Sequence, residues 1–405
     1  MAGFSRGLPA LSSVFSQLAQ SALSLIATIL FARLLSPSTF GILAIFWLIW
    51  MLWLSMNRSV FSEQLLASAA STRARRGYKS FVLIWLTAAL TISLGASLPF
   101  GDVALLGGVT YIAFFVGSDA ARYYVMAATG GRRGGFYGAA GILIVDVLRL
   151  LLALGALLTA FAGAPTALTL TLVNMSAGIW ILCLIDSRQS FSLRLARGYV
   201  GGLGKFERAI SLQFILGTGV SQAAPAIALL PFGFASVGAI RLTQTLLSPI
   251  TLLTTAFQPT VIKLFAARKA DEQGLRRLLL GLIASALLIG VLLASTAVVT
   301  VNLFGEEFIP AQYVDLVREI CLPIAVMLAV AVVGQPGGAI IRVRRLGVES
   351  LRGQVIGSFT TLALCIAAAP FTLTHFVWAL AAGSITTVCV TYALMAASEL
   401  SKSRG

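Results

Sequence analysis

Four charged residues lie within two long apolar runs, where a charge is costly to bury. Asp119 and Arg122 are spaced i, i+3 in one run, and Asp146 and Arg149 have the same spacing in the next. Residues three apart are neighbours on a helix, so each pair can form its own ion pair. If the two helices fold back on a turn centred on residue 134, Asp119 lies level with Arg149 and Arg122 with Asp146. We therefore expect a neutral four-charge cluster, which is either a structural pin between two helices or a site that couples to a proton or ion.

A fifth buried charge, Arg241, lies in another apolar run with no acidic residue three or four positions away. It lies roughly 10 Å below the predicted outer end of its helix, at about 1.5 Å per residue. An arginine at this depth is taken as functional by default, and its guanidinium can bind phosphate through two parallel hydrogen bonds. We expect Arg241 to bind phosphate. The alternatives are pairing with an acid on another helix and snorkelling outward.

Amide and hydroxyl side chains follow one face of two predicted helices. They are Ser13, Ser16, Gln17, Gln20, Ser24 and Thr28 in the first helix, and Gln244, Thr245, Ser248, Thr251 and Thr255, with Arg241, in the eighth. Spacings of three and four place such residues on one helix face. Small polar residues also pack helices together, so packing is the alternative. We expect the two stripes to line a hydrated central cavity.

The runs that carry these residues are long, apolar and helical. Of 405 residues, 58% are hydrophobic and 11% are charged, and the mean hydropathy is +0.95. A soluble protein has about 25% charged residues. With about 20 residues per span, we expect an all-α polytopic membrane protein with about 12 transmembrane helices. The predicted spans are residues 9–32, 40–57, 81–99, 103–127, 137–162, 166–185, 209–230, 234–259, 277–303, 313–338, 353–371 and 376–398.

The basic residues predict the orientation of these spans. With twelve spans, 24 of the 29 lysines and arginines fall on one side of the membrane. Cytoplasmic loops carry the excess of Lys and Arg, so both termini are expected to be cytoplasmic. The longest connection, residues 186–208, divides the chain into halves of similar length. We expect two six-helix bundles, residues 1–200 and 201–405.

The sequence lacks the motifs of catalytic and metal sites. Cys183, Cys321, Cys365 and Cys389 lie inside apolar runs without C-x-x-C spacing, and His375 has no clustered partners. There is no G-x-S-x-G, H-E-x-x-H or Walker A motif. We therefore expect no enzyme activity, no cofactor and no metal. Because the basic residues are spread between apolar runs, we expect no nucleic-acid partner either.

Two segments carry a family resemblance. Residues 31–41, Phe-Ala-Arg-Leu-Leu-Ser-Pro-Ser-Thr-Phe-Gly, resemble the junction of the first two helices in the polysaccharide transporter family, the O-antigen-type flippases. Residues 304–308, Phe-Gly-Glu-Glu-Phe, are similar to a stretch that follows the ninth span there. The resemblance implies the fold shared with multidrug and toxic compound extrusion transporters and the lipid II flippase. It also implies a cavity lined mainly by helices one, two, seven and eight.

For function, the resemblance implies a bacterial inner-membrane flippase. Its cargo would be a polyprenyl-pyrophosphate-linked oligosaccharide, an O-antigen or exopolysaccharide repeat unit, moved from the cytoplasmic to the periplasmic leaflet. Implied partners are this lipid-linked oligosaccharide, membrane lipids and the polysaccharide polymerase machinery. The residues expected to bind substrate are Arg33, Arg241, Gln17, Gln20, Gln222 and Gln244. The alternative is a cation-coupled drug or metabolite exporter of the same fold, and the two arginines favour an anionic cargo.

Overall fold

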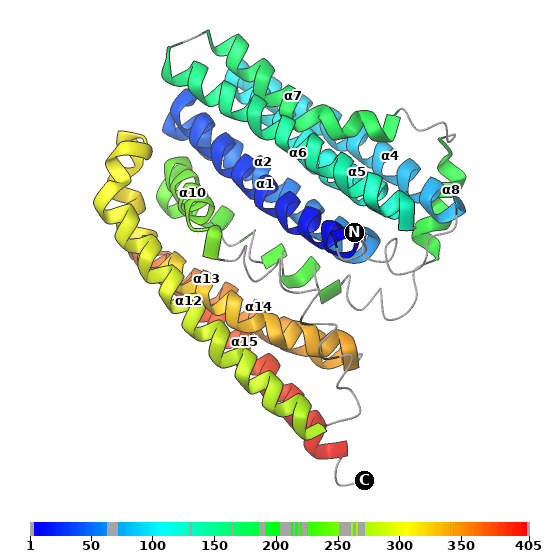
Figure 1. Cartoon of the computed structure of the whole chain (residues 1–405). Helices are drawn as coiled ribbons and strands as arrows, with labels where there is room; N and C mark the ends of the chain where they lie inside the picture. Colours follow the sequence, from blue (N-terminus) through cyan, green and yellow to red (C-terminus); the bar gives the residue numbers. More distant parts are fainter. Residues whose placement is uncertain are drawn as a thin grey trace. The chain divides into compact units, whose positions relative to one another are not determined.

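The chain is helical throughout the part that the structure, a computed structural model, describes. That part comprises residues 4–62, 72–128, 132–163, 165–185, 191–202, 225–250, 272–344 and 346–402, with residues 212, 213, 215–217, 219, 220, 223, 261 and 265. Ten helices within it are long and apolar enough to cross a membrane. The chain is therefore a multi-pass membrane protein (Figure 1).

The chain divides into two compact units, Met1–Glu207 and Arg208–Gly405. The described helices of the first unit are α1 (Phe4–Leu34), α2 (Pro37–Met56), η1 (Asn57–Ser62), α4 (Thr72–Ser97), η2 (Leu98–Phe100), α5 (Val103–Ala128), α6 (Arg132–Phe161), α7 (Thr166–Ile185) and α8 (Leu193–Gly201). Those of the second unit are α10 (Leu229–Leu246), α12 (Glu272–Phe308), α13 (Ala311–Arg344), α14 (Gly347–Ala368) and α15 (Leu373–Lys402).

Helices extend beyond several predicted spans because a helix does not end where its hydropathy falls. α4 begins at Thr72 and not at residue 81, since the basic residues before the apolar run continue the same helix. α12 ends at Phe308, so the segment 304–308, expected to follow the ninth span, is helical. The seventh and eighth predicted spans, 209–230 and 234–259, are described in part, at residues 212, 213, 215–217, 219, 220, 223 and 225–230 and at residues 234–250.

Local signals explain two of the helix junctions. Ser36 caps α2 by accepting a hydrogen bond from the Thr39 N–H at 3.3 Å, and Pro37 occupies the first turn, where its missing N–H costs nothing. Gly233 interrupts α10 with φ 77° and ψ 176°, a conformation that suits glycine. This break falls in the predicted junction between spans seven and eight.

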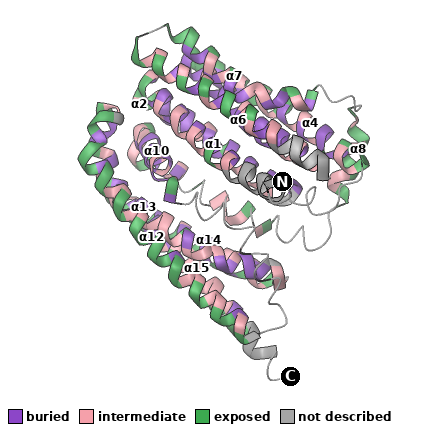
Figure 2. Cartoon of the chain, in the orientation of Figure 1, coloured by how far each residue is buried: buried purple, intermediate pink, exposed green. Residues whose placement is uncertain are grey.

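The long helices carry a buried and an exposed stripe (Figure 2). Large apolar side chains occupy exposed positions, such as Ile92 at 71% and Leu288 at 62%. Soluble monomers rarely expose large apolar patches, so this surface suits contact with lipid. Within the first unit, α2 and α4 pack through aromatic rings: Trp53 stacks on Trp85 with ring centroids 3.5 Å apart.

Close helix packing in the second unit depends on glycines of α14 that face threonines of α15. A Cβ at Gly357 would lie 2.8 Å from the Thr387 Cα, and one at Gly353 would lie 2.7 Å from the Thr391 Oγ1. The first of these neighbours is backbone, which cannot rotate away. Small residues of this kind let membrane helices approach closely.

We expect Gly357→Ala to destabilise the protein, because the added methyl group must push α15 away from α14. Overpacking of this kind costs about 1–3 kcal/mol. The matched control is Gly281→Ala on α12, where a Cβ would meet nothing within 4 Å; there, alanine should stabilise the helix by up to about 1 kcal/mol. Thermal unfolding in detergent measures both. Equal melting temperatures for the two variants would contradict the proposed tight contact.

Candidate functional site

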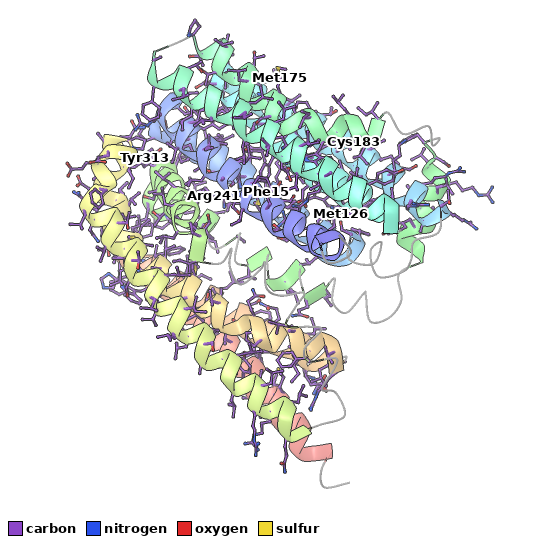
Figure 3. The ribbon with its side chains drawn as sticks, in the orientation of Figure 1. Phe15, Met126, Met175, Cys183, Arg241 and Tyr313 are labelled. Carbon is purple, nitrogen blue, oxygen red and sulfur yellow. The ribbon has the colours of Figure 1, made fainter. Side chains whose placement is uncertain are left out.

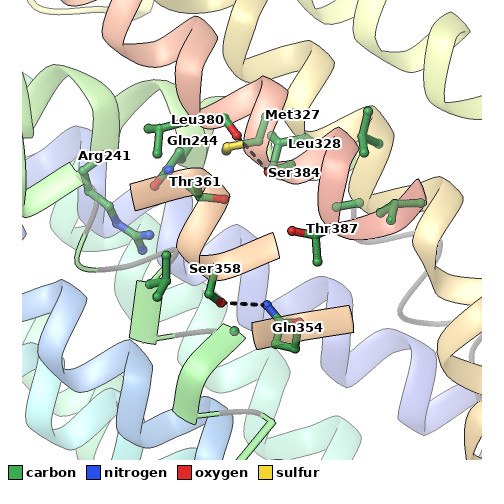
Figure 4. A pocket seen from close by; sticks show the side chains of 15 residues that line it. Arg241, Gln244, Met327, Leu328, Gln354, Ser358, Thr361, Leu380, Ser384 and Thr387 are labelled. Carbon is green, nitrogen blue, oxygen red and sulfur yellow. Dashed lines mark hydrogen bonds between the residues drawn. The ribbon is translucent and has the colours of Figure 1, made fainter. Parts of the chain in front are cut away.

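A cavity of about 420 Å³ lies within the second unit. Arg241 projects from α10 (Figures 3 and 4). The other walls come from α13, α14 and α15, together with Gly217 and Val220. The described lining residues are Gly217, Val220, Arg241, Gln244, Met327, Leu328, Val330, Ala331, Gln354, Ser358, Thr361, Leu380, Ser384, Thr387 and Val388.

One wall of the cavity is held by an amide-hydroxyl pair on α14. The Gln354 Nε2 donates to the Ser358 Oγ at 3.3 Å, and the Ser358 hydroxyl donates to the Leu216 carbonyl oxygen at 3.4 Å (Figure 4). A Cβ at Gly217 would lie 2.7 Å from the Gln354 Cδ, so a side chain there would displace the Gln354 amide. The pair therefore ties α14 to the segment at 216–217.

The other cavity hydroxyls belong to Thr361, Ser384 and Thr387. Each donates its proton to the carbonyl oxygen four residues earlier on its own helix, at 2.7, 3.1 and 2.9 Å respectively. A hydroxyl that has donated its proton still has lone pairs that accept hydrogen bonds. These side chains can therefore accept hydrogen bonds from a bound ligand.

The charge of the cavity comes from Arg241. It is half-buried and follows the helix break at Gly233 on α10. Among the other described lining residues none is charged, and in particular none is a carboxylate. The described wall is therefore cationic and otherwise composed of hydrogen-bonding and apolar groups.

A network of buried charges lies within the first unit. The Asp119 carboxylate accepts from the Arg58 Nε and Nη2, both at 2.8 Å, and from the Arg122 Nη2 at 3.1 Å. Arg122 also donates to the Ser16 Oγ of α1 at 2.6 Å. The network thus joins η1, α5 and α1 through charged hydrogen bonds.

The second half of the network is built on α6. Arg149 binds Asp146 at 3.1 Å, the Ser118 Oγ at 3.2 Å and the Ser176 carbonyl oxygen at 2.9 Å. The Trp180 Nε1 of α7 donates to the same carboxylate at 3.1 Å. Arg149 and Asp146 are fully buried, so these contacts replace the water that both charges lose.

The two i, i+3 pairs expected from the sequence are confirmed, but the expected neutral four-charge cluster is wrong. Arg58 joins it, giving three basic and two acidic residues and a formal charge of +1. Helical spacing identified only the charged residues that lie inside apolar runs. Arg58 lies just after the end of α2, so spacing did not reveal it. The Asp146 Oδ2 and the Gln20 Nε2 have no hydrogen-bond partner among the described residues.

The predicted substrate residues of α1 lie in the first unit. Gln20 is buried and belongs to the charge network, because its Oε1 accepts from the Arg149 Nη1 at 3.3 Å. Gln17 is half-buried. Arg33 is exposed at the end of α1, where its guanidinium lies 4.2 Å from the centre of the Phe161 ring.

Of the predicted substrate residues in the second unit, Arg241 and Gln244 both line the cavity, while Gln222 lies outside the described residues. Sequence reasoning missed the polar residues of α14 and α15. Their spacing could have revealed them, because polar residues recur at intervals of three and four at positions 354, 358 and 361 of α14 and at positions 384 and 387 of α15. That is the same periodicity that marked the stripe on α1.

Solved transporter structures share this fold. An inward-facing multidrug resistance MATE family transporter of the MOP superfamily matches with a TM-score of 0.66 at 12% identity, covering 98% of this chain and 100% of that one. An outward-facing conformation matches with a TM-score of 0.60 at 13% identity, covering 98% and 96%. The MATE transporter VcmN of Vibrio cholerae matches with a TM-score of 0.63 at 13% identity, covering 99% and 98%.

No protein-family model matches the chain, and no curated protein sequence matches it either. The similarity to the solved structures is therefore one of fold. The chain has the all-helical fold of the MATE transporters of the MOP superfamily over nearly its whole length.

We expect Asp119→Asn to destabilise the first unit strongly, because it leaves Arg58 and Arg122 without their shared counterion. Removing one partner of a buried ion pair costs about 3–5 kcal/mol. The control is Glu306→Gln, which breaks the ion pair with Arg318 at a side chain that is 73% exposed; such pairs contribute about 0–1 kcal/mol. Thermal unfolding measures both. If Asp119→Asn unfolds at the wild-type temperature while transport is lost, the network couples ions and does not hold the bundle together.

Proposed function

We propose that this protein is an alternating-access transporter of the bacterial inner membrane. Its cargo is a polyprenyl-pyrophosphate-linked oligosaccharide, moved from the cytoplasmic to the periplasmic leaflet. The observation that carries the proposal is the single guanidinium, that of Arg241, in a cavity whose other described lining residues are uncharged. The fold shared with inward-facing and outward-facing MATE transporters supports alternating access.

The charge of the cavity favours an anionic cargo. A cation entering it would meet Arg241 and, among the described lining residues, no carboxylate to offset the repulsion. A pyrophosphate would gain charge-assisted hydrogen bonds from the guanidinium, and the planar group can bind two phosphate oxygens at once. Charge-assisted bonds are also stronger in a site of low dielectric than in water.

The polar lining supports a sugar-bearing cargo. Gln244 and Gln354 each have an amide that can donate and accept hydrogen bonds, and three hydroxyl groups already donate to their own helices. Sugar hydroxyl groups donate and accept in the same way. The apolar side chains of Met327, Leu328 and Leu380 complete the wall, a mixture that is typical of small-molecule sites.

The cavity size fits part of such a cargo. A volume of about 420 Å³ lies within the range of about 300–1,000 Å³ that small-molecule sites occupy. It can take the pyrophosphate and the first sugar, while the prenyl chain stays in the lipid. The hydrocarbon interior opposes passage of the charged head alone, and the cavity lowers this cost by replacing water with protein groups.

The second candidate is a drug exporter of the same fold. The inward-facing and the outward-facing structural neighbours are both named multidrug resistance transporters, which supports this alternative. Buried carboxylates, Asp119 and Asp146, are present in the first unit, but both already form ion pairs with arginines. Binding of a cationic dye by the purified protein, without binding of a prenyl pyrophosphate, would favour the exporter.

We expect Arg241→Ala to weaken binding of a short-chain prenyl-pyrophosphate sugar by about ten- to a hundredfold, because charge-assisted bonds contribute about 1.5–3 kcal/mol each. Arg241→Lys should retain part of the affinity, since it keeps the charge and loses the bidentate geometry. Titration calorimetry of the purified protein in detergent measures both.

The matched control is Arg277→Ala, which removes an exposed arginine of α12 in the same unit. It should leave the affinity unchanged, and thermal unfolding should show that all three variants fold as the wild type does. Wild-type affinity in a folded Arg241→Ala protein would remove Arg241 from the substrate site and, with it, the main support for an anionic cargo.

A further inference from the structure

We propose that α13 contains a hinge at Pro336, that the Tyr392 hydroxyl holds this hinge, and that bending there changes access to the cavity. Tyr392 is then a positioning residue for transport. The role in transport rests on the proposed function. The hinge itself is a property of the second unit and can be measured without cargo.

Pro336 lies inside α13. Because proline has no backbone N–H and its ring crowds the carbonyl group four residues earlier, the hydrogen-bond ladder is interrupted at Val332. The next bond of a regular helix would join the Gly337 N–H to the Val333 carbonyl oxygen. In a membrane, backbone groups freed at a proline need partners from neighbouring helices, side chains or water.

Tyr392 of α15 supplies that partner. Its hydroxyl accepts a hydrogen bond from the Gly337 N–H at 3.0 Å and donates one to the Val333 carbonyl oxygen at 2.8 Å. One hydroxyl therefore binds both backbone groups of the turn beside the proline. A Cβ at Gly337 would lie 3.0 Å from the Tyr392 Cζ, so glycine permits this approach.

The two parts of α13 have different surroundings. Before the proline, its side chains line the cavity, at Met327, Leu328, Val330 and Ala331. After it, its side chains join a buried apolar cluster with other helices, at Ala339, Ile340 and Ile341, and Tyr392 packs against the same cluster. A bend at Pro336 would therefore move the part that borders the cavity relative to the part that belongs to this cluster.

Hydrogen exchange of the purified protein tests the hinge. Tyr392→Phe removes only the hydroxyl, so amides 333–340 should exchange about three- to tenfold faster, the factor expected for one hydrogen bond. The matched control is Tyr111→Phe in the first unit, whose hydroxyl donates to the Leu23 carbonyl oxygen at 3.2 Å. That variant should leave exchange at 333–340 unchanged, and unchanged exchange in Tyr392→Phe would overturn the proposal.

Pro336→Ala separates a hinge from a static tie between α13 and α15. With an N–H at position 336, the ladder can close and the hydroxyl is no longer needed. Exchange at 333–340 should then be the same in Pro336→Ala and in the double variant Pro336→Ala, Tyr392→Phe. If removing the hydroxyl accelerates exchange equally in both backgrounds, Tyr392 is a static tie and the hinge is absent.

Labelling tests the link to the cavity. In a variant with its four native cysteines replaced by alanine, a water-soluble maleimide should label Ala331→Cys faster when Tyr392→Phe is added, by a factor similar to that of exchange, and more slowly when Pro336→Ala is added. Equal rates in the three proteins would show that the hinge does not control access and would overturn the proposal. Both measurements are made without cargo, so their outcome is independent of whether a prenyl pyrophosphate binds at Arg241.

Discussion

The lack of water in the hydrocarbon core governs this structure, because polar groups there depend on partners within the protein. The first unit meets this demand with a network in which the two carboxylates of Asp119 and Asp146 bind three arginines and several neutral groups. The network reaches α1, η1, α5, α6 and α7. Since breaking one buried pair leaves a charge without its counterion, these contacts make the arrangement of the helices interdependent.

The second unit meets the same demand in another way. The described lining of its cavity holds one charge, that of Arg241, and hydroxyl groups that donate to their own helices. These hydroxyl groups already have partners for their protons, and the wall still offers acceptors and one cationic donor. The two units therefore differ chemically: ionic contacts join helices in the first, whereas the described cavity wall of the second is polar and carries one cation.

Helix-breaking residues in the second unit occur on two helices that line the cavity. Gly233 breaks α10 before Arg241, and Pro336 lies inside α13 after the segment that lines the cavity. A proline inside a helix removes one backbone hydrogen bond, and beside Pro336 the Tyr392 hydroxyl binds the Gly337 N–H and the Val333 carbonyl oxygen. Tight glycine-threonine contacts join α14 and α15, so the unit combines a close-packed helix pair with two helices that contain helix-breaking residues.

The membrane class, most helix positions and the i, i+3 ion pairs could be predicted from the sequence, because hydropathy and helical spacing are local properties. The same reasoning found Arg241 and Gln244, since a polar residue in an apolar run is visible along the chain. Only the tertiary structure decided which polar residues share a site. It placed Gln20 in the charge network and brought Arg58 to Asp119, 61 positions away. It also brought α14 and α15 to the cavity, because the partners of a buried polar group depend on helix packing, which spacing within one helix does not specify.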